Sequence, residues 1–149
     1  MIEYSLKILN DLSSINLILH RCASSFFNQS LNAESILQCL SEKFYKNAQV
    51  VQICNDNKLV GFAAYYCNDF ENKNAFLSMI VILKEYQSMG AGGVLLKYII
   101  EDCKRVGMDN LLLEVDKKNE FAINFYLKKG FVFLNKETKD GRFMSLTIK

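Results

Sequence analysis

Apolar residues recur at intervals of three and four along the first third of the chain, which is the period of a helix with one buried face. One such segment runs from Leu12 to Phe26, and Asn10 or Asp11 can cap it. Residues 26–30 interrupt the period, and a second amphipathic helix is predicted after them, with Asn32 as its cap. The predicted buried stripe of this second helix consists of Ile36, Leu37, Leu40 and Phe44.

From Ala48 the pattern changes to short apolar runs, which are typical of strands. We expect strands over residues 50–54 and 59–67, joined by a polar turn at residues 55–58, and a weaker strand over residues 4–9. A polar loop over residues 68–74 leads into an apolar strand over residues 76–83. Because this strand is apolar on both faces, it is expected in the middle of a sheet. Strict alternation puts Phe76, Ile80 and Ile82 on one face and Leu77, Met79, Val81 and Leu83 on the other.

The second half of the chain alternates between helical and strand-like segments. A glycine-rich loop, residues 87–93, opens a long helix that Gly107 ends. A strand over residues 110–115, a helix over residues 119–129 closed by Gly130, and a hairpin over residues 131–148 with its turn at 139–141 complete the chain. This order predicts an α/β fold with a mixed sheet, helices on both faces, and one domain over residues 1–149. The buried side of the long helix is predicted to hold Leu95, Ile99, Cys103 and Val106.

Composition excludes several classes of protein. Of the 149 residues, 50% are hydrophobic, which argues against disorder, and a net charge of +2 gives no nucleic-acid footprint. The apolar runs are too short for a membrane span, and residues 1–25 lack the pattern of a secretory signal. The five cysteines are widely spaced, without a CxxC or Cys/His cluster, so we expect buried free thiols, no metal and a cytoplasmic location.

The glycine-rich loop carries the strongest chemical signal. A loop that feeds a helix N-terminus leaves main-chain N–H groups free for an anion such as phosphate. A Walker loop is excluded because no Gly-Lys-Ser/Thr follows, and the dinucleotide fingerprint fails because Leu95 stands where its third glycine should be. The alternative is that these glycines only permit a tight turn, although three glycines in four residues carry an entropic cost that a plain turn does not require.

Two motifs point to one family. Gln87-Ser88-Met89-Gly90-Ala91-Gly92 resembles the Q/R-x-x-G-x-G/A signature of the GNAT superfamily of N-acetyltransferases, which bind acetyl-coenzyme A. The segment from Asn119 to Phe131 (NEFAINFYLKKGF) is similar to the family's second motif, N-x-x-A-x-x-(F/L)-Y-x-x-x-G-F. The resemblance implies the GNAT fold, with a central, mostly antiparallel sheet of about six to seven strands.

The resemblance also implies roles for particular residues. The backbone of Ile80, Val81 and Ile82 would pair with the pantetheine arm, and one N–H near Val81 and Ile82 would stabilise the oxyanion. Tyr126 matches the tyrosine that protonates the departing thiolate; its alternative is an aromatic that only packs beside Phe125. Main-chain N–H groups from Ser88 to Gly93 would hold the pyrophosphate, so the loop's predicted coenzyme-binding residues are Gln87, Ser88, Met89, Gly90, Ala91, Gly92 and Gly93.

Three further positions keep two interpretations each. Asn119 matches a coenzyme-contacting asparagine, and it is also a good helix cap. Glu114 lies five residues before Asn119, and this spacing resembles that of the catalytic base in ribosomal-protein N-terminal acetyltransferases. The alternative is that Glu114 forms an ion pair with a lysine and that a chain of water molecules acts as the base. His20 lies off the apolar stripe and is expected on the surface, although its pKa keeps a base role open. Two lysine pairs are either solvated or attract the coenzyme's 3′-phosphate, namely Lys117-Lys118 and Lys128-Lys129.

The sequence therefore predicts an N-acetyltransferase that moves acetyl from acetyl-CoA to a primary amine by direct attack in a ternary complex. The expected acceptor is a small molecule, such as an amino sugar, polyamine or amino acid. A peptide N-terminus is the alternative acceptor, and a non-catalytic acyl-CoA-binding module is a third reading. No nucleic-acid or membrane partner is expected, and a homodimer is possible because dimers are common in the family.

Overall fold

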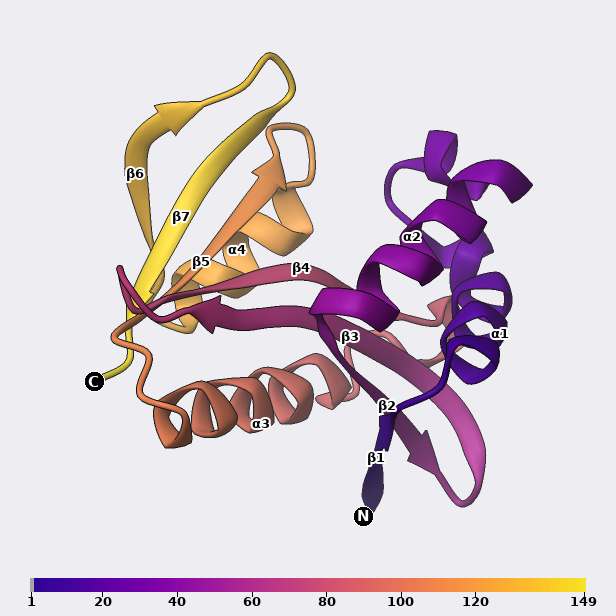
Figure 1. Ribbon diagram of the computed structural model, residues 1–149. Coiled ribbons are helices and arrows are strands. Elements are labelled where there is room, and N and C mark those ends of the chain that lie inside the picture. Colours follow the sequence, from indigo (N-terminus) through magenta and orange to yellow (C-terminus); the bar gives the residue numbers. More distant parts are fainter. Residues whose placement is uncertain (1) are drawn as a thin grey trace.

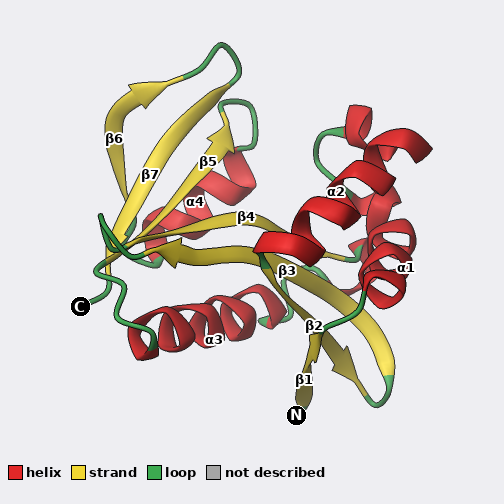
Figure 2. Ribbon diagram, in the orientation of Figure 1, coloured by secondary structure: helices red, strands yellow, loops and turns green. Residues whose placement is uncertain are grey.

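The computed structural model describes residues 2–149 and arranges them around one seven-stranded sheet, with strand order β1-β2-β3-β4-β5-β7-β6 (Figures 1 and 2). Every neighbouring pair is antiparallel except β4 and β5, which are parallel. The predicted mixed sheet is confirmed. The strands are β1 (Tyr4–Leu9), β2 (Gln49–Asn55), β3 (Lys58–Asp69), β4 (Asn74–Ile82), β5 (Asn110–Asp116), β6 (Val132–Glu137) and β7 (Gly141–Thr147).

Helices cover both faces of the sheet, as predicted (Figure 1). On one face, α1 and α2 pack over β2 and β3 in a cluster that includes Leu19, Phe44 and Phe62. On the other face, α3 and α4 pack in a larger cluster centred on Leu95, Ile99 and Leu111. No helix within residues 2–149 has the length and apolarity to cross a bilayer. The helices are α1 (Leu12–Cys22), α2 (Glu34–Asn47), α3 (Ala91–Arg105) and α4 (Glu120–Lys128).

The first two helices differ from expectation at their ends. Asp11 is the cap of α1, since its carboxylate accepts a hydrogen bond of 3.0 Å from the Ser14 N–H. The helix ends at Cys22, and a 3₁₀ turn carries the chain to Phe26. The prediction that Asn32 caps α2 is wrong: Asn32 ends a second 3₁₀ turn, and Ala33, with no capping side chain, precedes the helix.

The buried stripe of α2 is confirmed at Leu37 and Phe44, whereas Ile36 and Leu40 are only half-buried. The expectation of five buried thiols is also only partly met. Cys22 and Cys103 are buried, Cys54 and Cys67 are half-buried, and Cys39 is exposed on the outer side of α2.

A β-bulge at Ser78 divides β4 into two halves. Ala64 pairs with Met79 and Tyr65 with Leu77, so Ser78 is an extra residue without a partner on β3. The extra residue reverses the inward and outward alternation that follows it. Leu77 therefore shares the α3 face with Ile80 and Ile82, while Met79 and Val81 face α1 and α2. The predicted grouping of Phe76 with Ile80 and Ile82 is wrong because strict alternation cannot anticipate the bulge.

The contact between β3 and β4 leaves no room for a side chain at Gly61. A Cβ there would clash with the Val81 carbonyl oxygen and lie 3.0 Å from Ile82 Cδ1. We expect Gly61→Ala to lower the free energy of unfolding by about 3 kcal/mol, because the two strands must separate. Urea titration measures this loss. As a control, Lys58→Ala, at the exposed start of the same strand, should leave the stability nearly unchanged. A Gly61→Ala protein as stable as wild type would show that the two strands can separate at little cost.

Candidate active site

The sheet opens between β4 and β5. Pairing of the two parallel strands stops at Leu77 and Leu113, and residues 78–82 have no partner on β5. In Figure 1, β5 and β7 rise away from β4 beyond this point and leave a wedge between the strands. The wedge begins at the Ser78 bulge, which bends β4 just where the pairing ends. The unpaired edge of β4 therefore offers main-chain donors and acceptors to a ligand.

The register shows which groups face the wedge. The Leu83 N–H donates to Val60 O at 2.8 Å, so in an antiparallel ladder the main-chain groups of Val81 also point to β3. Those of Ile80 and Ile82 then point to the open side. The expectation that Val81 contributes its backbone is not supported by this register. Gln87 Nε2 donates to the outward Ile82 carbonyl at 3.0 Å, which leaves the Ile82 N–H as the free donor there.

The loop from Gln87 to Gly90 is exposed and held in an unusual backbone shape. Ser88 has φ of 65° and Gly90 has φ of 86°, both in the left-handed region. Successive N–H groups in such a turn form a concave site for an anion. The Tyr4 hydroxyl donates a 2.7 Å hydrogen bond to the Met89 carbonyl, so the first strand holds this loop in place. Tyr4 was missed in the sequence because the two residues are 85 positions apart.

The N-terminus of α3 lies at the same candidate anion site. The first helical hydrogen bond runs from the Val94 N–H to the Gly90 carbonyl at 3.2 Å, so the N–H groups that precede Val94 have no partner within the helix. The first turn of α3 holds no acidic residue. A Cβ on Gly92 would lie 3.5 Å from the Phe125 ring, and one on Gly93 would lie 3.3 Å from Lys129 Nζ. These two glycines therefore allow α4 to pack closely beside the loop.

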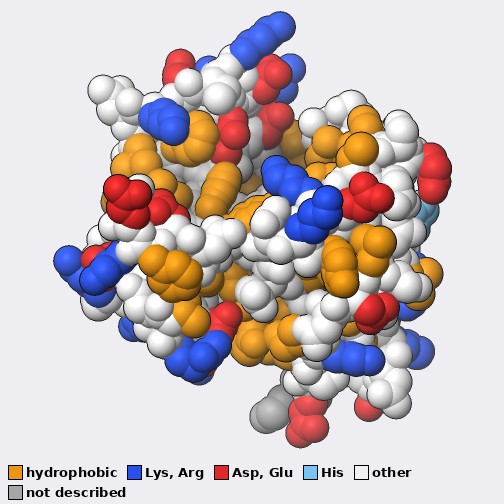
Figure 3. All heavy atoms as spheres, viewed as in Figure 1, with side chains coloured by type: hydrophobic (Ala, Val, Ile, Leu, Met, Phe, Trp, Pro, Cys, Tyr) orange, Lys and Arg blue, Asp and Glu red, His pale blue; other side chains and the backbone are white. Residues whose placement is uncertain are grey.

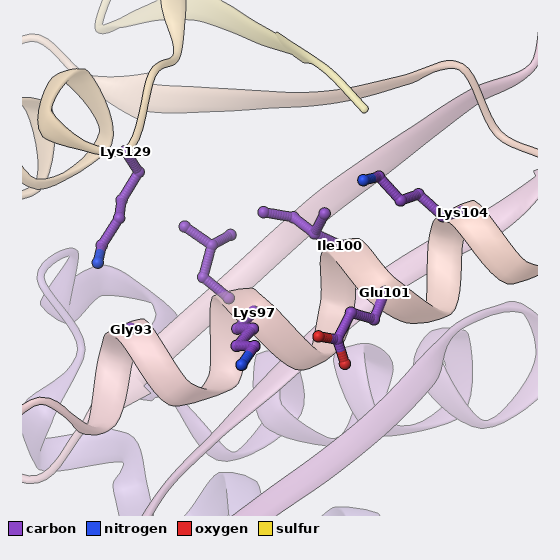
Figure 4. A pocket seen from close by; sticks show the side chains of 7 residues that line it. Gly93, Lys97, Ile100, Glu101, Lys104 and Lys129 are labelled. Carbon is purple, nitrogen blue, oxygen red and sulfur yellow. The ribbon is translucent and has the colours of Figure 1, made fainter. Parts of the chain in front are cut away.

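A shallow pocket of about 260 Å³ lies along α3 next to this N-terminus. Figure 4 shows Lys97 and Lys104 on α3 and Lys129, which follows α4, arranged around it. Lys129 Nζ also lies over the Phe125 ring, 5.7 Å from its centroid. Of the predicted lysine pairs, Lys129 is the member whose ammonium stands beside the anion site.

Tyr126 lies in α4 on the face that packs against the α3 side of the sheet. Its ring makes edge contacts with the rings of Phe125 and Phe131, each at a centroid distance of 5.3 Å. Burial raises the pKa of Tyr126 to about 12, so the phenol keeps its proton throughout the neutral range. We find no hydrogen bond that occupies its hydroxyl among residues 2–149. A protonated phenol with a free hydroxyl suits proton donation.

Asn119 precedes α4 and caps it, because its side-chain oxygen accepts a 3.2 Å hydrogen bond from the Ala122 N–H. The prediction that Asn119 caps a helix is therefore confirmed. A coenzyme contact from Asn119 stays a prediction.

Glu114 follows Leu113, the last residue of β5 that pairs with β4, so it lies at the narrow end of the wedge. Leu113 and Val115 are buried on the α3 side, so the exposed Glu114 side chain projects to the opposite face, toward α1 and α2. The Thr138 hydroxyl donates a 2.7 Å hydrogen bond to Glu114 Oε2 and accepts one of 3.0 Å from the Gly141 N–H. Glu114 forms no ion pair with a lysine among residues 2–149, so that alternative is wrong.

The face of the sheet that carries α1 and α2 is hollowed. Figure 3 shows apolar side chains in a recess between the β5–β7 part of the molecule and the α2 part. Acidic side chains lie at the rim of the recess on the side of β5 and its following loop, and Lys or Arg side chains stand at the opposite rim, on the side of α2 (Figure 3). Phe143, opposite Glu114 in the β5–β7 register, presents its side chain to the same face.

His20 lies away from the wedge and joins two helical segments. Its Nδ1 lies 2.8 Å from the Asn16 carbonyl and its Nε2 2.9 Å from Glu34 Oε2. These two partners raise the pKa of His20, the carbonyl contributing most. The expectation of a solvated residue is too simple, because the imidazole ties α1 to the start of α2. No cluster of three or more potential metal ligands is found within residues 2–149.

The arrangement combines a sheet that splits between β4 and β5, a helix N-terminus with unpaired N–H groups, and Tyr126 on one face of the sheet. The family model described as "Acetyltransferase (GNAT) family" matches residues 12–131, and the chain belongs to this family. It is therefore an acetyltransferase of the N-acetyltransferase type. Solved structures of the fold include complexes with coenzyme A and with acetyl-coenzyme A.

Relatives with different acceptors resemble the chain to similar degrees. N-alpha-acetyltransferase 50 of zebrafish (Danio rerio) is 30% identical over 106 residues, 66% of this chain and 62% of that protein. Spermine/spermidine N(1)-acetyltransferase of Bacillus subtilis is 31% identical over 121 residues, 71% of this chain and 74% of that protein. The ribosomal-protein-S18-alanine N-acetyltransferase of Escherichia coli superposes with a TM-score of 0.79 at 20% identity, covering 99% of this chain and 95% of that one. The last likeness concerns the fold alone.

Proposed function

We propose that the chain transfers acetyl from acetyl-coenzyme A to a primary amine of a small molecule, with a polyamine-like amine as the first choice. The observation that supports this proposal most directly is that the two candidate acid–base groups lie on opposite faces of the sheet at the wedge. Tyr126 packs on the α3 face and Glu114 projects to the α1–α2 face. The amine would then attack a thioester in the wedge from the Glu114 side, and the thiolate would leave on the Tyr126 side.

Each step of the transfer has a residue to perform it. The N–H groups of the loop and the α3 N-terminus, from Ser88 to Gly93, bind the pyrophosphate. The N–H of Ile82 or Ile80 stabilises the oxyanion of the tetrahedral intermediate. Glu114, directly or through a water, accepts a proton from the ammonium of the acceptor, and the free amine attacks the thioester carbonyl. The tetrahedral intermediate then collapses: the C–S bond breaks, Tyr126 gives its proton to the coenzyme A thiolate, and the nitrogen of the new amide gives its extra proton to the tyrosinate.

The polyamine preference rests on two observations. The name of the Bacillus relative, which aligns over 71% of the chain, gives this activity, and the acidic side chains on the β5 side of the recess suit a cationic amine (Figure 3). A peptide N-terminus is the second candidate. The name of the zebrafish relative supports it, as does the spacing between Glu114 and Asn119.

The proposal is tested by thiol release from acetyl-CoA with a matched panel: spermine, spermidine, an amino sugar, free amino acids, and peptides with free or blocked N-termini. We expect turnover with a small amine and a much lower value of kcat/KM with every peptide. Turnover confined to unblocked peptides would replace the first candidate with the second. Acetyl-CoA binding without turnover on any amine would contradict both.

A further inference from the structure

Two cysteines from different elements meet on the α3 face of the sheet. Cys67 lies near the end of β3 and Cys103 in the last turns of α3, and their Sγ atoms are 2.9 Å apart although 36 positions separate them in the chain. Both thiols are free. We propose that this pair is an oxidative modification site, in which a peroxide converts the two thiols into a Cys67–Cys103 disulfide.

The geometry needs little change for the bond to form. A disulfide has an S–S length of about 2.05 Å, so the sulfur atoms must approach by less than about 1 Å. The backbone around Cys67 can supply this movement because the β3–β4 ladder is irregular between Tyr66 and Asp69. Cys103 stays fixed, since it is fully buried in α3.

The two thiols have distinct roles. A hydrogen bond from the Cys103 thiol lowers the pKa of Cys67, and donating that bond, together with burial, raises the pKa of Cys103. Cys67 is also the more accessible of the two, being half-buried where Cys103 is buried. Cys67 is therefore the thiol that a peroxide meets first, and Cys103 is the resolving thiol.

The chemistry balances with a peroxide as the two-electron oxidant. The Cys67 thiolate attacks one peroxide oxygen, the O–O bond breaks, and Cys67 becomes a sulfenic acid while the other oxygen leaves as hydroxide or alkoxide and takes up a proton. The Cys103 sulfur then attacks the Cys67 sulfur. The S–S bond forms, the S–O bond breaks, and the hydroxide leaves with the Cys103 proton as water. Two thiols are oxidised and one peroxide is reduced.

The surroundings distinguish this pair from the other cysteines. Asp102, next to Cys103, accepts a 2.7 Å hydrogen bond from the Tyr65 hydroxyl and a 2.5 Å one from Arg105. Its carboxylate is thus tied to β3 and to its own helix, which holds α3 against β3 at the level of the two thiols. The disulfide would make this tie covalent at the C-terminal end of the helix whose N-terminus forms the anion site.

The test is limited oxidation of the full-length chain with hydrogen peroxide, followed by removal of the peroxide, denaturation and alkylation. We expect the count of free thiols to fall from five by two, the mass to fall by two hydrogen atoms, and digestion to give a cross-linked peptide that contains Cys67 and Cys103. The oxidised protein should unfold at a Tm several degrees higher, and a dithiol reductant should reverse the shift.

Variants separate this site from general thiol oxidation. Cys67→Ala should keep its remaining thiols, and Cys103→Ser should stop at a Cys67 sulfenic acid that dimedone traps. Cys54→Ser, which removes a half-buried thiol elsewhere, should still form the cross-link. Retention of all five thiols, or oxidation confined to dimers linked through the exposed Cys39, would overturn the proposal. Because Cys67 is half-buried, its alanine variant tests the proposal even if Cys103→Ser fails to fold.

Discussion

Tyr126→Phe is expected to lower kcat by roughly 10²- to 10³-fold while the dissociation constant of acetyl-CoA stays nearly unchanged. The substitution keeps the ring that packs against Phe125 and Phe131 and removes only the hydroxyl proton. The coenzyme A thiolate must then leave without a proton donor. Steady-state thiol release measures kcat, and isothermal titration with acetyl-CoA measures binding.

A matched control is Tyr98→Phe, because Tyr98 also packs half-buried against the same core but has no assigned role. Its kcat should be close to that of wild type. Burial holds the pKa of Tyr126 at about 12 against about 10 in the unfolded chain. The stability that depends on the neutral phenol is therefore present below pH 10 and lost as pH rises toward 12. Unchanged turnover in Tyr126→Phe would remove the tyrosine from the mechanism.

Local sequence patterns predicted the elements of the fold well because their determinants are local. The turn between β2 and β3 is set by Asp56 and Asn57, which adopt positive φ as short polar residues readily do. The end of α3 is set by Gly107, also in the left-handed region. The glycine loop and the Asn119 cap were found in the same way, from residues next to each other in the chain.

The wedge itself could not be predicted from periodicity. Ser78 is a single polar residue in an apolar run, and the sequence gives no sign that β3 skips it. Whether Val81 or Ile82 presents its N–H to the ligand depends on that skip, since one extra residue exchanges the two faces. The motif names only a segment of β4, and the register decides which of its residues point to the open side.

Long-range contacts were missed for a different reason. Tyr4 is joined to Met89, and Thr138 to Glu114, by single hydrogen bonds across 85 and 24 positions. A tyrosine in an edge strand and a threonine in a turn are common residues in common places, so neither carries a signal of its own. Each contact becomes visible only when the sheet brings β1 beside the loop and the last hairpin beside β5.

Glu114→Gln should lower kcat/KM by roughly 10²- to 10³-fold at pH 7, and the deficit should narrow as pH rises. A lysine-like or polyamine nitrogen has a pKa of about 10.4, so freeing it of its proton at pH 7 costs about 4–5 kcal/mol, against about 1 for an α-amine. A catalytic base lowers this cost only where the amine is still protonated. The difference in kcat/KM between wild type and variant should therefore shrink as the pH approaches the pKa of the amine. The measurement is the pH profile of kcat/KM for wild type and variant on the amine that the panel selects.

Thr138 donates the hydrogen bond to Glu114, so replacing it gives a second test of the role of that carboxylate. Thr138→Val removes the hydroxyl that holds Glu114 Oε2 at 2.7 Å, and we expect a smaller loss of about 10-fold that Thr138→Ser restores. Glu120→Gln, an exposed carboxylate in the first turn of α4, serves as the control and should leave the profile unchanged. A deficit in Glu114→Gln that stays constant at every pH would mean that the carboxylate binds the acceptor and that water accepts its proton.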